Sequence, residues 1–400
     1  MLAMVGSTAD PEPESGPSAP EPITLLYVST VASTAGHFLA PYAAHFRTLG
    51  WRVDVAANGA SADSAVQRAF DNVHDLPLSR SPSHLLGLAR AGGAVTRAVS
   101  SGYDIVHVHT PIASFVTRLA VRRLALRSRP MVAYTAHGFH FHRGGHMVTN
   151  ALFLLAERLA GRWTDRLVVI NDEDHAAARR HRIVPPQDLV RMPGIGLDTG
   201  AYSRARVAPG AFDRARRELG VPPLAPLFVM VGDLNRNKRP ADAVEALARM
   251  REGTGHLVFI GDGPERGPVE ALAVRRGVGA RVRVTGFRDD ILPVLGSATA
   301  LIMPSRREGL ARSIMEALAL EVPVVASAAR GNAELVDADG FVVETGDVQA
   351  LAESMSWLVD HPDERRAMGA RGRARMVQRY DLRYLIALHE ELYRGMLEAR

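Results

Sequence analysis

Two successive series of short apolar runs constrain the fold of this chain more than any other feature. In each series, a run with the length and composition of a buried strand is followed by a segment with a helical pattern. The first series comprises the runs 23–29, 52–57, 103–109, 131–135 and 167–170. The second series comprises the runs 227–231, 256–260, 281–284, 298–303, 323–326 and 341–343. Strands that alternate with helices form parallel sheets wound on both faces, so we expect an α/β protein with two Rossmann-like domains facing across a cleft.

Proline and glycine mark where these two domains begin and end. The first 22 residues contain several prolines among small and acidic residues, a composition that predicts a disordered tail. Prolines and glycines interrupt the alternation again at 185–210, which we interpret as the connection between the domains. The predicted parts are the tail 1–22, the domains 23–200 and 201–380, and a last helix at 381–400.

The absence of cysteine excludes several kinds of chemistry. No disulfide framework, thiolate metal site or cysteine nucleophile is available to this chain. The first ten residues lack the basic and apolar segments of a secretory signal peptide, so none is expected. No apolar run is long enough for a membrane-spanning helix. The expected location is therefore cytoplasmic, with peripheral contact at the inner face of the plasma membrane left open.

The most informative strand end follows the run 298–303. Glu308 lies in the turn that follows this strand, and Glu316 lies eight positions later, at the start of an expected helix at 314–320. In an open α/β sheet, ligands bind at the carboxyl ends of strands, and the free N–H groups of a helix start attract anions. Two carboxylates would repel a phosphate there, but they accept hydrogen bonds from hydroxyl groups. The turn therefore predicts contacts with the hydroxyl groups of a sugar and a ribose.

A second strand end carries positive charge. Gly232 follows the run 227–231, and Arg236, Lys238 and Arg239 come just before an expected helix. Lys238 is the only lysine in a chain whose formal charge is +5, and a flexible ammonium is not interchangeable with a planar guanidinium. Positive side chains beside free N–H groups suit a diphosphate. The alternative is a solvated basic turn.

Three further strand ends carry weaker signals. Gly36 permits a close approach of the backbone to a phosphate or a sugar, although the dinucleotide-binding fingerprint is not met. The backbone at Gly286 either meets a nucleobase edge or forms a plain turn. His137 is expected to contact the substrate. Four histidines lie within 137–146, but no carboxylate lies among them and their spacing matches no standard metal site, so no metal is expected.

Two other groups of residues have simpler interpretations. His107 and His109 share one face of an expected strand, and we assign them to the core or to a supporting role. Five arginines decorate an expected helix and its exit between residues 118 and 129. They form either a solvated face or a surface that contacts anionic lipid.

Together these motifs resemble a known family. The spacing of Glu308 and Glu316, the turn from Gly232 to Lys238, and the sequence around His137 are similar to the family 4 retaining glycosyltransferases of the GT-B fold. The resemblance is closest to the branch that acts in bacterial capsule, exopolysaccharide and lipid-linked oligosaccharide assembly. Segments similar to that branch run in order from about residue 23 to about residue 380.

The resemblance implies a role for each matching residue. Glu308 would contact the donor sugar near its reacting centre, and Glu316 would bind the ribose hydroxyls. Lys238 would bind the donor diphosphate, and Gly36 would approach it from the other domain. His137 would lie beside the reacting sugar.

The resemblance also implies how phosphate charge is balanced. Backbone N–H groups around Gly309, Leu310 and Ala311 would cap the phosphates. Enzymes similar to this chain use no bound metal and no cofactor, because basic side chains and helix dipoles stabilise the leaving diphosphate. This chain departs from many members by having Asp233 after the turn glycine, and from its branch by having Ala311 at a common proline position.

These features predict transfer of a hexose from a nucleotide-diphosphate donor to an acceptor, with retention of anomeric configuration. The expected acceptor is a polyprenyl-diphosphate-linked sugar, and no nucleic-acid partner is expected. A small soluble acceptor, such as a natural product or a sugar phosphate, is the alternative. A sugar-nucleotide epimerase of the same fold and a non-catalytic sugar-nucleotide binder are further alternatives.

Overall fold

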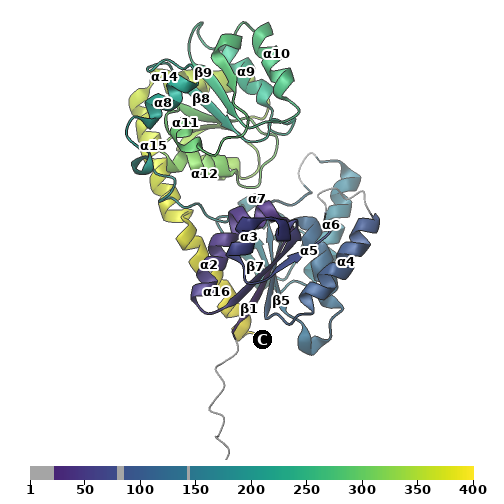
Figure 1. Cartoon of the computed structure of the whole chain (residues 1–400). Coiled ribbons are helices and arrows are strands. Elements are labelled where there is room, and N and C mark those ends of the chain that lie inside the picture. The colour runs from purple at the N-terminus through teal and green to yellow at the C-terminus, as the bar shows by residue number, and fades with distance from the viewer. Residues whose placement is uncertain (1–21, 79–84, 142–144) are drawn as a thin grey trace, which may run out of the picture.

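The computed structural model describes residues 22–78, 85–141 and 145–400, which fold into two α/β domains (Figure 1). Of the predicted disordered tail, all but residue 22 lies outside the described residues. Among the residues described, no helix is both long and apolar enough to cross a membrane.

The first domain is built on a seven-stranded parallel sheet in the order β3-β2-β1-β4-β5-β6-β7. Its strands are β1 (Thr24–Val31), β2 (Arg52–Asn58), β3 (Val73–Asp75), β4 (Ile105–His109), β5 (Met131–Ala136), β6 (Arg166–Val169) and β7 (Leu189–Arg191). One face is covered by α1 (Ala32–Thr34), the π-helical turn η1 (Ala35–Leu39), α2 (Ala40–Thr48) and α3 (Ser64–Ala69). The other face is covered by α4 (Leu85–Val99), α5 (Pro111–Arg122), α6 (Met147–Gly161) and α7 (Asp172–Arg180).

The second domain is built on a six-stranded parallel sheet in the order β10-β9-β8-β11-β12-β13. Its strands are β8 (Leu227–Val231), β9 (His256–Ile260), β10 (Val282–Val284), β11 (Ala300–Met303), β12 (Val324–Ser327) and β13 (Gly340–Val343). One face packs on α8 (Ala211–Glu218), α11 (Ile291–Gly296), α12 (Arg312–Ala319), α13 (Asn332–Val336) and α15 (Pro362–Arg379). The other face packs on α9 (Pro240–Arg249), α10 (Arg266–Arg275) and α14 (Val348–Asp360).

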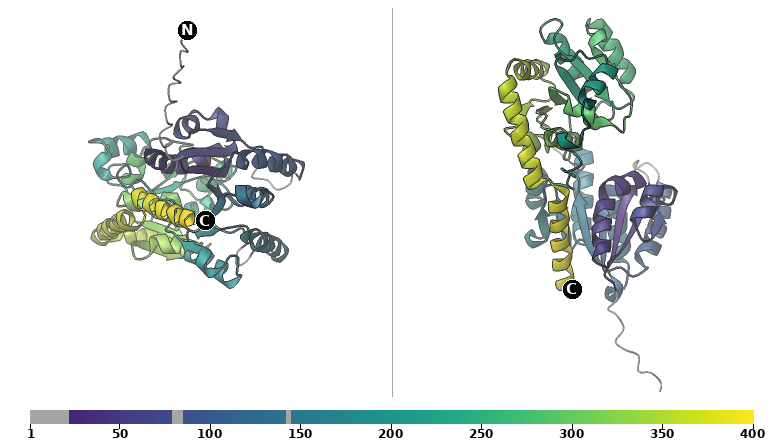
Figure 2. Two further views of the ribbon diagram at one scale, coloured as in Figure 1. Left: turned by 90° about the horizontal axis from the view of Figure 1, so that it is seen from below. Right: turned by 60° about the vertical axis from the view of Figure 1, so that its left-hand side comes forward.

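The last helix, α16 (Leu382–Glu398), leaves the second domain and packs on the first, as the long C-terminal helices in Figure 2 show. Its residues Leu385, Tyr393 and Met396 are buried in the core beneath α2. The hydroxyl of Tyr393 donates a hydrogen bond to the hydroxyl of Tyr27 on β1, 3.2 Å away. The chain therefore crosses between the domains twice.

One helix and two strands were missed by the sequence analysis. The segment between the predicted strands 52–57 and 103–109, where no element was predicted before residue 82, contains the helix α3 and the strand β3, and the expected connection at 185–210 contains the strand β7. Both strands are three residues long and lie at the edges of the first sheet. A strand of this length shows too little alternation for the hydrophobic pattern to identify it.

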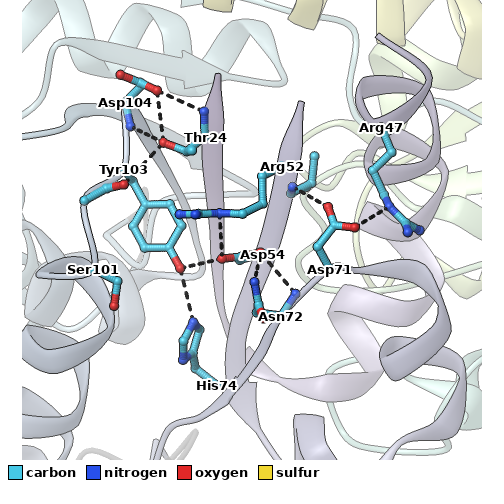
Figure 3. Close-up of polar contacts among 12 residues, drawn as sticks. Thr24, Arg47, Arg52, Asp54, Asp71, Asn72, His74, Ser101, Tyr103 and Asp104 are labelled. Carbon is cyan, nitrogen blue, oxygen red and sulfur yellow. Dashed lines mark hydrogen bonds and ion pairs between the residues drawn. The ribbon is translucent and has the colours of Figure 1, made fainter. Parts of the chain in front are cut away.

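Asp54 is a structural residue near the start of β2 (Figure 3). It is buried and accepts hydrogen bonds from the hydroxyl of Tyr103 at 2.7 Å, and from the backbone and side-chain N–H groups of Asn72 at 3.0 and 3.1 Å. Arg52 adds an ion pair at 3.5 Å. These contacts satisfy the carboxylate at the amino end of the strands, away from the carboxyl ends where ligands bind.

A chain of histidines runs through the core of the first domain. Its members are His107, His109, His137 and His389. His107 and His109 are buried, as predicted; His107 bonds the hydroxyl of Thr135 at 2.8 Å, and His109 bonds His137 at 3.0 Å. Burial lowers the pKa of His137 and of His389 to about 4 and lowers the pKa of His107 and His109 well below 6.5. The cluster is therefore neutral at pH 7.

The histidine cluster should make the fold sensitive to acid. Each histidine takes up a proton in the unfolded chain near pH 6.5 but stays neutral in the folded chain, so stability is complete above that pH and is lost as the pH falls toward 4. The expected slope is about 1.4 kcal/mol per pH unit for each histidine. Denaturant unfolding of the variant His389→Phe between pH 5 and 7 should show a shallower slope by about that amount. The variant His37→Gln, at an exposed position, is the control; an equal slope in all three proteins would contradict the assignment.

Candidate active site

Loops from the carboxyl ends of both sheets meet between the two domains. Gly138 follows β5, Gly309 follows β11 and Gly331 follows β12. A side chain on Gly309 would collide with the carbonyl oxygen of His137, and one on Gly331 would collide with the carbonyl oxygen of Gly309. Gly138 and Gly331 also have φ angles of 130° and 78°, a region that favours glycine. Glycine at 138 and 309 lets the two domains approach backbone to backbone, and Gly331 lets the loop after β12 pack on the loop of Gly309 within the second domain.

Lys238 and Glu308 form an ion pair at this meeting point. Lys238 Nζ lies 2.8 Å from Glu308 Oε1, and the two side chains are 19% and 12% exposed. A β-carbon on Gly232 would lie 3.5 Å from Lys238 Cε, so the lysine side chain lies against the end of β8. The side chain of Asn237 donates to the carbonyl oxygen of Arg307 at 2.9 Å, which joins the two loops. The structure brings together the lysine and the first carboxylate of the sequence analysis, and it pairs them with each other.

Glu316 is buried on α12, and one of its carboxylate oxygens accepts a hydrogen bond from Arg312. Arg312 Nε donates to Glu316 Oε1 at 2.8 Å. Burial raises the pKa of the Glu316 carboxyl, while Arg312 acts in the opposite direction. The guanidinium carbon of Arg312 lies 5.2 Å from the ring centre of Phe38 on η1 and 5.9 Å from that of Tyr202. Arg312, which the sequence analysis did not single out, therefore covers the carboxylate predicted to bind ribose.

The start of α12 is free of a side-chain cap. Its N-cap residue, Ala311, has an extended backbone, and no side chain accepts from the first N–H groups of the helix. The preceding Leu310 packs toward the interdomain connection, where a β-carbon on Gly194 would lie 3.0 Å from Leu310 Cδ1. An uncapped helix start retains its capacity for an anion. The phosphate-binding role of Gly309, Leu310 and Ala311 remains a prediction.

His137 directly follows β5 and is half-buried. Its Nε2 bonds His109 Nδ1, and the two rings stack with their centres 5.3 Å apart. Because its pKa is about 4, the imidazole is uncharged at neutral pH. It is suited to a hydrogen bond with a hydroxyl group rather than to an ion pair.

The other histidines of that segment give no metal site in the described residues. No group of three or more His, Asp or Glu side chains within 22–78, 85–141 and 145–400 is arranged to hold a metal ion. His142 lies outside the described residues.

Three further residues were predicted to bind the donor, namely Gly36, Arg236 and Gly286. Gly36 belongs to η1, the element that also carries Phe38. The side chain of Arg236 is 93% exposed, with its Nε 3.5 Å from a carboxylate oxygen of Glu265. Gly286 has a φ angle of 73°, and its carbonyl oxygen accepts from the N–H of Gly261 at 2.9 Å. Their contacts with a donor remain predictions.

Arg330 joins the domains beside the site, and the sequence analysis gave it no role. It is buried, and its Nη1 donates to the carbonyl oxygen of Phe139 at 3.0 Å and to Asp174 at 2.8 Å. Its Nη2 donates to the carbonyl oxygen of Phe141 at 3.3 Å. Asp174 is 156 positions away in the chain, so no local pattern identifies this contact.

Both domains match families of known proteins. Residues 211–375 match the family described as glycosyl transferases group 1, and residues 33–194 match the glycosyl transferase 4-like domain. EpsD of Bacillus subtilis (strain 168), which is named as a glycosyltransferase, is 33% identical over 87% of this chain and 91% of its own length. The UDP-Gal:alpha-D-GlcNAc-diphosphoundecaprenol alpha-1,3-galactosyltransferase of Escherichia coli is 28% identical over 64% of this chain and 67% of its own.

The fold is also found in solved structures. HepE of Anabaena, crystallised in complex with UDP, matches with a TM-score of 0.77 over 94% of this chain and 100% of its own, at 22% identity. A likeness at that identity shows the two-domain GT-B fold alone, whereas the similarity to EpsD extends over nearly the whole of both sequences. The chain therefore belongs to the group 1 glycosyltransferases, the retaining family 4 hexosyltransferases of the GT-B fold.

Proposed function

We propose that this glycosyltransferase transfers a hexose from a nucleoside diphosphate to a sugar carried on a polyprenyl diphosphate. The observation that carries the donor half of this proposal is the ion pair between Lys238 and Glu308 near α12. The ion pair supplies a cation for the diphosphate and a carboxylate for the sugar hydroxyls. The start of α12 supplies free N–H groups for the phosphates.

Donor binding changes the partner of Lys238 in this proposal. A dianionic diphosphate is a stronger partner for an ammonium than one carboxylate is, so Lys238 moves from Glu308 to the phosphate oxygens. Glu308 is then free to accept hydrogen bonds from the hexose hydroxyls next to the reacting carbon. The ammonium and the start of α12 balance the charge of the leaving diphosphate, so the proposal includes no metal and no cofactor.

The remaining residues position the two sugars. Glu316 retains acceptor capacity for ribose hydroxyls beyond the oxygen that Arg312 occupies. His137 is uncharged and lies where the first domain contacts the loop of Gly309, so it can hydrogen-bond a hydroxyl of the transferred hexose.

During transfer, the bond from the anomeric carbon to the phosphate oxygen breaks and the acceptor oxygen bonds to that carbon on the same face. The acceptor proton passes to the leaving diphosphate.

The names of the relatives support the acceptor class. The Escherichia coli relative is named for transfer of galactose from UDP-Gal to diphosphoundecaprenol-linked GlcNAc.

UDP-hexoses with a synthetic polyprenyl-diphosphate sugar are therefore the first pair to assay. Radiolabelled hexose should appear in the butanol-extractable lipid fraction. Label that instead accumulates in water with a sugar phosphate or a small aglycone would favour a soluble acceptor, and an epimerised donor would exclude transfer.

The variant Glu308→Gln should separate transfer from donor binding. The amide keeps the size of the side chain but loses the charge, so turnover should fall by about 100-fold or more. UDP should bind as tightly as before or more tightly, because Lys238 no longer has a carboxylate partner. Turnover by coupled UDP release and affinity by calorimetry test both points. Glu245→Gln, which removes a carboxylate paired with Arg276, is the matched control. Near-normal turnover of Glu308→Gln would overturn the role given to Glu308.

The variant Lys238→Gln should lose affinity for UDP. A charge-assisted hydrogen bond contributes about 1.5–3 kcal/mol, so the dissociation constant for UDP should rise by about 10- to 140-fold. The adjacent Arg239 donates to both oxygens of Asp242 at 2.6 and 2.9 Å, so Arg239→Gln should weaken UDP binding by less than about threefold. Equal losses in the two variants would refute a special role for the lone lysine.

A further inference from the structure

An exposed stripe of apolar side chains lies along α6. Val148, Leu152, Leu155 and Leu159 are 57%, 63%, 65% and 40% exposed, and Met147 in the first turn is 82% exposed. Their spacing of four, three and four residues places the first four side chains on one stripe of the helix. A contiguous exposed apolar stripe marks an interaction surface.

The charged side chains beside this stripe are positive. Arg158 and Arg162 are exposed at the end of α6. The one carboxylate of α6, Glu157, is buried on the opposite face, where it accepts from Arg118 and from Tyr134, each at 3.0 Å. The surface of α6 therefore presents apolar and cationic groups, and its own carboxylate is withdrawn from that surface.

A basic cavity continues this surface from Leu155 and Leu159 toward α7. It has a volume of about 1120 Å³. The arginines in its wall are Arg158, Arg162, Arg166, Arg179 and Arg182. The wall also contains Asp165 and Asp188, and Asp188 is paired with Arg166 at 2.9 Å. Five arginines against two carboxylates leave the lining with an excess of positive charge. Such a wall is complementary to phosphate groups.

A second copy of this chain is a poor partner for the α6 surface. A two-fold contact through this stripe would bring the arginines of both copies together, and neither helix has an exposed carboxylate to pair with them. The stripe from Val148 to Leu159 is also much shorter than the roughly three to four heptads that sustain a coiled coil. An anionic bilayer offers an acyl boundary for the leucines and phosphates for the arginines.

We infer that α6 docks the enzyme on an anionic lipid bilayer, lying in the interface with the stripe from Val148 to Leu159 inserted. In Figure 1, α6 lies on the side of the first domain opposite α16. Phe141, whose carbonyl oxygen bonds Arg330 at the domain contact, precedes Met147 by six residues and so lies at most about 20 Å from it. Docking through α6 therefore holds the active site near the bilayer surface, where a lipid-linked sugar is presented.

This surface differs from the one that the sequence analysis considered. Arg118, the first arginine of the stripe between residues 118 and 129, is only 1% exposed and is paired with Glu157, and its guanidinium lies over the ring of Tyr134. It is therefore unavailable to lipid. The exposed arginines of the stripe begin at Arg122 and Arg123, and the docking inference concerns the apolar face of α6.

Vesicle co-sedimentation of the purified full chain tests this inference without donor or acceptor. The wild type should sediment with phosphatidylcholine vesicles that contain phosphatidylglycerol, and less with phosphatidylcholine alone or at high salt. The double variant Leu152→Gln/Leu155→Gln should bind more than about tenfold more weakly. The control Leu224→Gln/Val274→Gln changes two exposed apolar residues of the second domain and should bind as the wild type does. Equal thermal unfolding temperatures would show that the variants fold.

Three results would overturn the inference. In the first, the wild type stays in the supernatant at low salt. In the second, the Leu152/Leu155 double variant sediments with the vesicles as the wild type does. In the third, sedimentation velocity shows that the wild type is a dimer and that the double variant is not. The inference that α6 docks on a bilayer rests on the proposed function with a lipid-linked acceptor, but different experiments test the two proposals. Loss of vesicle binding would leave donor turnover with a soluble acceptor intact, and a soluble acceptor would leave vesicle binding intact.

Discussion

The ion pair between Lys238 and Glu308 is the interaction on which the candidate site depends. A lysine and a glutamate from two different strand ends neutralise each other at 2.8 Å, where the domains meet. A partly buried pair of this kind is costly to leave half-satisfied, so it stays closed until a better partner for either group arrives. In the proposed function, the diphosphate is that partner for Lys238, and the hexose hydroxyls are the partners for Glu308. The free enzyme thus keeps its donor-binding charges in a neutral, ordered form.

The interdomain contact sets the geometry in which this exchange can occur. Glycines at 138, 309 and 331 let the loops stack backbone to backbone, and the buried pair of Arg330 and Asp174 fixes the domains beside them. Arg312 lies between Glu316 and the ring of Phe38 on the first domain. Contact between Glu316 and a ribose is therefore coupled to the position of η1, the element that carries Gly36. A donor that binds the second domain would act on the first through Arg312.

The sequence predicted the parts of this protein that depend on local pattern. The apolar runs and helical segments located both sheets, and the strand ends located Lys238, Glu308 and His137, because a parallel sheet places its strand ends on one edge. The edge strands β3 and β7 were too short for the pattern to identify. The pairing of Lys238 with Glu308 joins residues 70 positions apart within the second domain, and the contact of Arg330 with Asp174 depends on how the two domains dock, so no local pattern contains either contact. The pair of Arg312 and Glu316 has the i,i+4 spacing of a helix, a signal that the sequence analysis did not use.

The single lysine of this chain allows a direct test of the exchange at Lys238. Protein made with ¹³C-labelled lysine has one lysine side-chain signal, so an NMR titration with UDP reports on this residue alone. The account predicts that the signal moves as UDP is added and saturates at the dissociation constant measured by calorimetry. Binding of UDP by calorimetry while the Lys238 signal stays unchanged would contradict it.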